Sequence, residues 1–215
     1  QYVFDFGKWS DSKERSDIKV LALPATNPDN KIDAYTWGYS SLSPITSLLT
    51  NAQIINETNY MTDKEKAIIE ELYNMIKNNK PGWQNFAKFL GIKSFLLRND
   101  FDYKLKGSPT AEPSVYKKVL NSPDLILVKK FGEWEVYDFK SEIPNNVEVF
   151  SKINYLNGEI KDLGKINSLP LFNPMEPLYV SGTSTKKENE ILKVRNKTFL
   201  IPMCVACNLR HKFID

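Results

Sequence analysis

The apolar run Ile92–Leu97 ends in a group of polar side chains that could bind a ligand: Arg98, Asn99, Asp100 and Asp102. Ligands of α/β sheets bind preferentially at the carboxyl ends of strands, where carboxylates and amides can hold sugar hydroxyls or a cation. Asn and Asp also favour turns, so the end of a strand explains the same residues without any ligand. Both interpretations are open at this point.

Three aromatic residues, Tyr35, Trp37 and Tyr39, alternate along a short upstream segment. Aromatic rings with a polar edge stack on sugar rings and are also common at protein interfaces. A local anchor that holds the segment to the core would use the same residues. If the aromatic segment meets the polar group in the fold, we expect a carbohydrate-binding site made of Trp37, Tyr39, Asn99 and Asp100.

The two cysteines and the single histidine of the chain lie together near its end, as Cys204, Cys207 and His211. Their spacing is that of half a zinc site, but a structural zinc needs four ligands, and a disulfide or free thiols fit these residues better. We therefore expect no metal and no cofactor. With only one histidine, a Ser-His-Asp arrangement elsewhere in the chain is excluded.

The composition is that of a soluble globular protein, with 215 residues, 41% hydrophobic and 26% charged. Lysines are scattered among acidic residues, so the net charge of +3 predicts no nucleic-acid partner. No apolar run approaches the roughly 20 residues of a membrane helix. The abrupt start at Gln1 suggests a processed or excised fragment. The glycosylation patterns at Asn56 and Asn196 are interpreted as chance matches.

The elements that would position the candidate residues follow from the hydrophobic pattern. Strands are predicted over Ile18–Leu23, Ile92–Arg98, Leu125–Phe131 and Trp134–Phe139, the last two joined by the hairpin turn Gly132-Glu133. Helices are predicted over 44–49 with Pro44 first, from the capping box Thr62–Glu65 to near Asn78, over 83–90 closed by Gly91, and from Pro113 to Leu120.

After Glu142 the hydrophobic pattern that predicts helices and strands becomes weaker. We expect strands at Val147–Ile153, Leu178–Val180 and Thr198–Pro202, and a short helix at Lys186–Leu192. The predicted fold class is α/β, a mixed sheet flanked by helices with an antiparallel hairpin near 125–139. The predicted division is an N-terminal extension at 1–17, a single α/β domain at 18–202 and a C-terminal tail at 203–215.

Several strings, in this order, resemble the α-(1→3)-arabinofuranosyltransferase family of polytopic GT-C membrane glycosyltransferases. They are Val20-Leu-Ala-Leu-Pro24, Tyr35-Thr-Trp-Gly38, Ser43-Pro-Ile-Thr-Ser-Leu-Leu49, Leu90-Gly-Ile-Lys-Ser-Phe-Leu-Leu-Arg-Asn-Asp-Phe-Asp102, Pro113-Ser-Val-Tyr116, Leu120-Asn-Ser-Pro123, Phe131-Gly132, Val136-Tyr137 and Tyr179-Val-Ser-Gly182. The shared order of these strings, over roughly residues 18–182, carries the resemblance.

The resemblance implies an extracytoplasmic domain that is membrane-attached in the full-length protein and belongs to an enzyme using polyprenyl-phosphate sugars. Its implied role is structural or acceptor-binding. Its implied partners are the membrane-embedded part of the same polypeptide and a glycan or lipid-linked sugar. The catalytic carboxylate of GT-C enzymes lies in the membrane part, so no catalytic residue is assigned here.

Two other functions are open from the sequence. One is a free-standing carbohydrate-binding or cell-surface interaction module without catalysis. The other is a small hydrolase acting through Asp100 and Asp102, which is weaker because carboxylates so close along one segment do not naturally oppose each other across a glycosidic bond.

Overall fold

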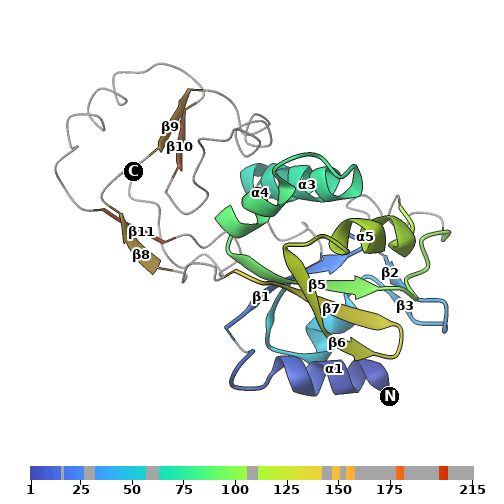
Figure 1. Ribbon diagram of the computed structural model, residues 1–215. Coiled ribbons are helices and arrows are strands. Elements are labelled where there is room, and N and C mark those ends of the chain that lie inside the picture. Colours follow the sequence, from blue (N-terminus) through green and yellow to red (C-terminus); the bar gives the residue numbers. More distant parts are fainter. Residues whose placement is uncertain are drawn as a thin grey trace.

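The architecture is known from a computed structural model (Figure 1). The structure describes residues 1–15, 17–26, 32–56, 63–105, 111–141, 147–150, 154–157, 178–181 and 199–202. Thr62, the predicted helix at 186–192 and the tail with Cys204, Cys207 and His211 lie outside these described residues.

A five-stranded mixed sheet forms the centre of the domain, in the order β4-β1-β5-β7-β6. Its strands are β1 (Lys19–Leu23), β4 (Gln53–Ile55), β5 (Ile92–Arg98), β6 (Leu125–Phe131) and β7 (Trp134–Phe139). Strands β4 and β5 run parallel to β1, whereas β7 runs antiparallel to both β5 and β6. The predicted fold class and the hairpin near 125–139 are confirmed.

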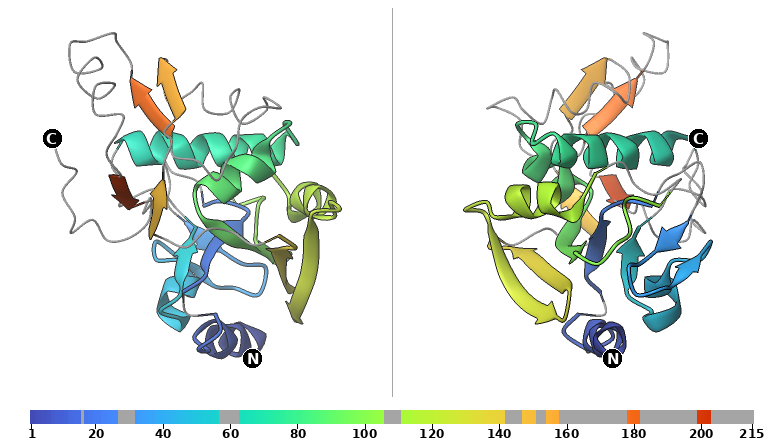
Figure 2. Two further views of the ribbon diagram at one scale, coloured as in Figure 1. Left: turned by 60° about the vertical axis from the view of Figure 1, so that its left-hand side comes forward. Right: turned by 90° about the vertical axis from the view of Figure 1, so that its right-hand side faces the viewer.

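Helices cover both faces of this sheet. They are α1 (Tyr2–Ser10), α2 (Ile45–Leu49), α3 (Asp63–Lys77), α4 (Trp83–Phe89) and α5 (Pro113–Leu120). Figure 2 shows α1 on one side of the sheet and α3 with α4 on the other. The two sides correspond to two clusters of buried apolar side chains.

In strand β1 every residue after Lys19 is apolar, because the strand is buried on both faces. Leu21 and Leu23 belong to the core under α3 and α4, while Val20 and Ala22 belong to the core that includes α1. Successive side chains of a strand point to opposite faces. A strand covered on both faces therefore needs a continuous apolar run, as the sequence indicated.

Smaller elements complete the described part. Strands β2 (Asp33–Ala34) and β3 (Ser40–Ser41) form an antiparallel pair. Strand β8 (Val147–Phe150) pairs antiparallel with β11 (Phe199–Pro202), and β9 (Asn154–Asn157) pairs parallel with β10 (Leu178–Ser181).

Several local features differ from the sequence-based expectation. Helix α1 was not predicted, because no helix or strand was assigned within the N-terminal extension at 1–17. The short strands β2, β3, β4 and β9 were also missed. In α2 the residue Pro44 is the N-cap, and the helix begins at Ile45 instead of at the proline. The predicted closure of α4 by Gly91 is confirmed, since that glycine has a φ of 71°.

Candidate functional site

Trp37 is the exposed residue around which the candidate site is built. Its side chain is 47% exposed, and one ring face stacks on Tyr35 at a centroid distance of 5.3 Å and an interplanar angle of 27°. Tyr39 lies beside it at 5.8 Å. We call Trp37, Tyr39 and the buried Tyr35 beneath them the aromatic platform.

The β2–β3 hairpin holds the aromatic platform in place. The backbone N–H of Tyr35 donates to the carbonyl of Tyr39 at 2.9 Å, and the Tyr39 hydroxyl donates to the carbonyl of Ser43 at 2.9 Å. Tyr35 also forms an antiparallel bridge with Phe101, which follows strand β5. The hairpin is thereby attached to the carboxyl end of β5.

Asp100 connects the platform to the rest of the fold. Trp37 Nε1 donates to Asp100 Oδ2 at 2.7 Å, and Trp134 Nε1 donates to Asp100 Oδ1 at 2.9 Å. The hydroxyl of Tyr2, on helix α1, donates to the same Oδ2. The structure thus brings together Trp37 and Asp100, two of the predicted site residues, from segments far apart in sequence.

These contacts make Asp100 a structural hydrogen-bond acceptor instead of a residue that binds carbohydrate directly. The residue is only 5% exposed, and its two carboxylate oxygens already accept three side-chain donors. Burial, followed by the hydrogen bond and the charge of Asp100, raises the pKa of Tyr2, so this hydroxyl keeps its proton. Asp100 is therefore an internal acceptor that orients Trp37, and it is not placed to act as an acid or a nucleophile.

Asn99 borders the site at the β6–β7 turn. Its backbone N–H and its side-chain Nδ2 both donate to the carbonyl of Glu133, at 3.0 and 2.9 Å. Asn99 is half-buried and Glu133 is exposed. Asp102 lies on the same β5 extension, where its N–H donates to the Ala34 carbonyl at 2.9 Å. Asn99 and Asp102 thus flank Asp100, the residue that holds Trp37.

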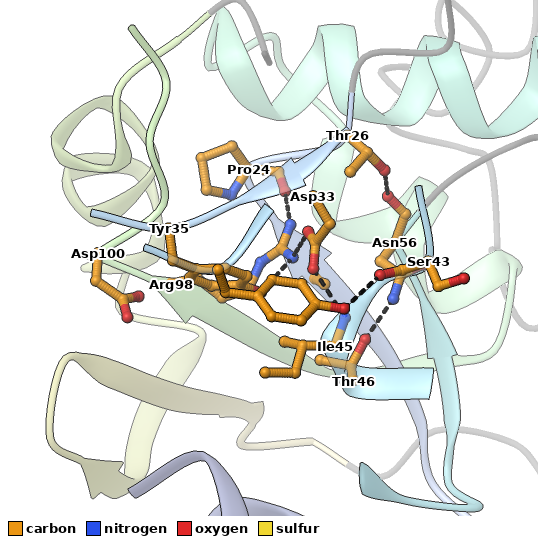
Figure 3. A network of polar contacts seen from close by, with 12 residues as sticks. Pro24, Thr26, Asp33, Tyr35, Ser43, Ile45, Thr46, Asn56, Arg98 and Asp100 are labelled. Carbon is orange, nitrogen blue, oxygen red and sulfur yellow. Dashed lines mark hydrogen bonds and ion pairs between the residues drawn. The ribbon is translucent and has the colours of Figure 1, made fainter. Parts of the chain in front are cut away.

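A buried ion pair supports the platform from below (Figure 3). Arg98 and Asp33 are both fully buried, with the guanidinium nitrogen 2.7 Å from the carboxylate. Arg98 also donates to the Tyr35 hydroxyl at 3.0 Å and to the Pro24 carbonyl. Asp33 accepts the N–H of Ile45 at 2.9 Å and so caps helix α2. Because breaking a buried pair leaves an uncompensated charge, this network fixes Tyr35 strongly.

Asn56 belongs to the same buried layer and bears on the glycosylation pattern in the sequence. The residue is 3% exposed, and its Nδ2 donates to Thr46 Oγ1 at 2.5 Å. A glycan would have to be attached to that nitrogen. The buried position supports the interpretation of the Asn56 pattern as a chance match.

Metal binding finds no support in the part of the chain that the structure describes. Those residues contain no group of three or more His, Cys, Asp or Glu side chains that could hold a metal ion. Cys204, Cys207 and His211 lie outside the described residues, so their expected state stays a prediction.

Sequence reasoning missed two members of the site, Tyr2 and Trp134. Trp134 follows the predicted Gly132-Glu133 turn, but nothing in its neighbourhood signals a hydrogen bond to Asp100. Tyr2 lies in a segment that was not expected to form a helix. Both contacts depend on the tertiary arrangement, which periodicity does not encode.

Comparison with known proteins identifies the fold but not the family. No protein-family model matches this sequence, and no curated protein matches it. Among solved structures, the arabinofuranosyltransferase AftD from mycobacteria is similar, with a TM-score of 0.64 and 17% identity over 78% of this chain. Two structures of a mutant form of that enzyme have TM-scores of 0.65 at 17% identity.

The matched region is a small part of the larger protein. This chain covers 14% of the length of the AftD chain in one structure and 15% in the other two. At 17% identity the similarity establishes a shared fold. Across the described residues, no helix combines the length and the apolar character that a membrane crossing requires.

Proposed function

We propose that this chain is an extracytoplasmic domain of a GT-C-type membrane glycosyltransferase, and that its aromatic platform binds the acceptor glycan. In this proposal the donor is a polyprenyl-phosphate sugar, and the transfer takes place in the membrane-embedded part of the same polypeptide. The domain itself positions the acceptor and performs no chemistry.

The fold similarity to a portion of an arabinofuranosyltransferase supports the first half of the proposal. The single observation that carries the second half is the exposed Trp37. Tryptophan is highly buried on average, yet this ring is 47% exposed and is fixed on a buried aromatic base. A rigid, half-open indole offers the flat apolar face on which a sugar ring stacks.

The decisive experiment measures glycan binding by the purified domain, using a neutral arabino-oligosaccharide as the probe in an NMR titration. Trp37→Ala should abolish the binding while lowering the melting temperature only slightly, because the side chain is already half in water. Leu48→Ala is the matched control, since Leu48 is an exposed apolar residue at 67% and lies outside the platform. It should leave both quantities unchanged.

A different result would support a purely structural role for Trp37. If the oligosaccharide binds the Trp37→Ala protein as well as the native one, the platform is not a glycan site. A large loss of stability, near the roughly 3–5 kcal/mol typical of a removed core aromatic, would show that Trp37 acts as a packing residue.

A free-standing carbohydrate-binding module is the second candidate, because the same exposed platform suits it. The native protein separates the two functions. An antibody against this domain should detect a large, detergent-extractable membrane protein if the domain is part of a transferase. A small protein released without detergent would favour the free-standing module.

A further inference from the structure

We infer that the aromatic platform takes an uncharged saccharide and rejects the phosphorylated, lipid-linked donor sugar. This inference rests on the proposed function and assigns the platform to the acceptor side of the reaction. The inference is based on the hydrogen-bonding groups and the charges that remain available around Trp37.

The polar atoms of the platform rings are already used inside the protein. Trp37 Nε1 donates to Asp100 at 2.7 Å, and the Tyr39 hydroxyl donates to the Ser43 carbonyl at 2.9 Å. Neither ring has an N–H or O–H hydrogen left for a ligand. The platform therefore contributes an apolar face, and directional bonds to a ligand must come from its border.

The border of the platform is rich in acceptors. Glu133 is exposed in the turn that receives two hydrogen bonds from Asn99, and its charge acts on Tyr2, whose hydroxyl meets Asp100. Asp102 follows Phe101, which bridges Tyr35, and its Oδ1 accepts the N–H of Lys104 at 3.2 Å, so Oδ2 is the oxygen left for a ligand. In the described part of the chain, no hydrogen bond to Asn99 Oδ1 is formed. These oxygens accept hydrogen bonds from sugar hydroxyls, which can donate.

The same acceptor-rich border is unfavourable for a phosphate group. At neutral pH its oxygens are acceptors with negative charge, so they are repelled by Glu133 and Asp102 and find no donor on the platform. Anion sites in proteins use guanidinium groups, ammonium groups or helix N-termini. The described residues of the platform and its border contribute no available guanidinium or ammonium group, and the N-terminus of α1 meets the site through the Tyr2 hydroxyl, which already donates to Asp100.

Arg98, Lys104 and Lys130 are cations close to the border along the chain, and each has a partner of its own. Arg98 is fully buried and paired with Asp33. Lys104 lies over the ring of Tyr103, with its nitrogen 5.6 Å from the centroid, and its charge acts on Glu112. Lys130, three residues before Glu133, pairs with Glu135 at 3.4 Å. Among the described residues, none of these three cations forms an ion pair with Glu133 or Asp102.

Asp100 contributes to this selectivity as a positioning residue. By accepting the Trp37 N–H it fixes the indole orientation and removes the only donor that a phosphate oxygen could have reached on that ring. The ligand expected from this arrangement stacks one uncharged sugar on Trp37 and donates its hydroxyls toward Asn99 and Glu133.

The test compares two probes on the purified domain at low ionic strength, where charge effects are least screened. One is a neutral arabino-oligosaccharide, and the other is the same oligosaccharide carrying a terminal phosphate. The Trp37 indole N–H resonance reports binding. We expect the phosphorylated probe to bind at least about 10-fold more weakly, and Glu133→Gln to reduce that difference.

Glu70→Gln is the matched control, because Glu70 is also exposed but lies on α3, on the other side of the sheet. It should leave the ratio of the two affinities unchanged. Equal binding of both probes to the native domain, with no effect of Glu133→Gln, would overturn the inference and leave the proposed function standing. If neither probe shifts the Trp37 resonance, the proposed function fails, and the inference with it.

Discussion

Lys19 is a buried lysine whose ammonium group donates to a single backbone carbonyl, that of Leu90, at 3.0 Å. The carbonyl lies at the C-terminal end of helix α4, where the helix dipole favours a positive charge. That favourable contact does not replace the lost hydration. Burial lowers the pKa of Lys19 to about 8, from its ordinary value of 10.5.

This shift predicts a stability that depends on pH. Between pH 8 and pH 10 the unfolded chain holds a proton on Lys19 that the folded chain has released, so the free energy of unfolding rises with pH. Below pH 8 both states are protonated, and the folded state bears the full cost of the buried charge. We expect a gain of about 2 kcal/mol between pH 7.5 and pH 10.

Urea denaturation of the native protein and of Lys19→Met at both pH values measures this contribution. Methionine has a similar length and no charge, so the variant should be the more stable protein at pH 7.5 and should lack the rise. Tyrosines with raised pKa values, such as Tyr116, act in the opposite direction from about pH 9 upward, where unfolded tyrosines begin to ionise. They are common to both proteins, so the difference between the two proteins isolates Lys19. An identical rise in the two proteins would contradict the assignment to Lys19.

At this scale the sequence indicated which residue types could form the site but not the direction of each side chain. The alternation of Tyr35, Trp37 and Tyr39 and the polar group after Leu97 indicated where to look. Whether the Asp100 oxygens face a ligand or the protein depends on Trp134 and Tyr2, which come from β7 and α1. Such long-range contacts leave no periodic pattern in the sequence.

Helix α1 is the element that links the N-terminal segment to the site. It carries Tyr2 to Asp100, and it packs so closely on helix α2 that Gly7 has no room for a side chain. A Cβ atom on Gly7 would lie 2.5 Å from the backbone oxygen of Leu49. Backbone atoms do not move aside as the end of a flexible side chain can, so the two helices would have to separate.

Gly7→Ala is therefore expected to reverse the usual effect of this substitution. In an exposed helix, alanine is more favourable than glycine by about 1 kcal/mol. Here we expect a net loss of about 1–3 kcal/mol from overpacking. We also expect a shift of the Trp37 indole N–H resonance, because Tyr2 moves with α1.

Lys8→Ala tests whether the effect belongs to the position and not to the helix in general. Lys8 is exposed on the same helix, so its removal should change the unfolding free energy by less than about 0.5 kcal/mol. A Gly7→Ala protein that is more stable than the native one would show that α1 and α2 are not held at this separation.

Element prediction succeeded where both faces of a strand are buried or where a helix has clear end signals. Strand β5 and helix α5, which starts at Pro113, are examples. It failed at β4, a three-residue edge strand, and at α1. The buried side of α1 includes Gly7 and Ser10 as well as apolar residues, so its pattern is weak. Packing of these elements against the sheet, more than local preference, defines them.

At the scale of the whole molecule, the sheet has a buried core on each face and a candidate site beyond the carboxyl ends of β1 and β5. The parallel neighbours β1 and β5 end in Leu23 and Arg98, and Arg98 donates to the carbonyl of Pro24. This is the edge where α/β sheets place their ligands. The two cores belong to the chain itself, which predicts that it folds without another domain.

The isolated chain should therefore bind a neutral acceptor glycan without transferring sugar to it. The carboxylate nearest the platform, Asp100, is buried and accepts hydrogen bonds from Tyr2, Trp37 and Trp134, so both of its oxygens are held by the protein and are poorly placed for general-base work on a sugar hydroxyl. Incubation of the purified chain with a labelled polyprenyl-phosphate sugar and a neutral arabino-oligosaccharide measures transfer directly. We expect product at the background level, in a preparation whose glycan binding is verified by the Trp37 resonance.

Turnover above background that is lost in Asp100→Asn would contradict both the acceptor-only role and the structural role of this carboxylate. Turnover that persists in Asp100→Asn would instead locate a catalytic group elsewhere in the chain and would equally refute the prediction.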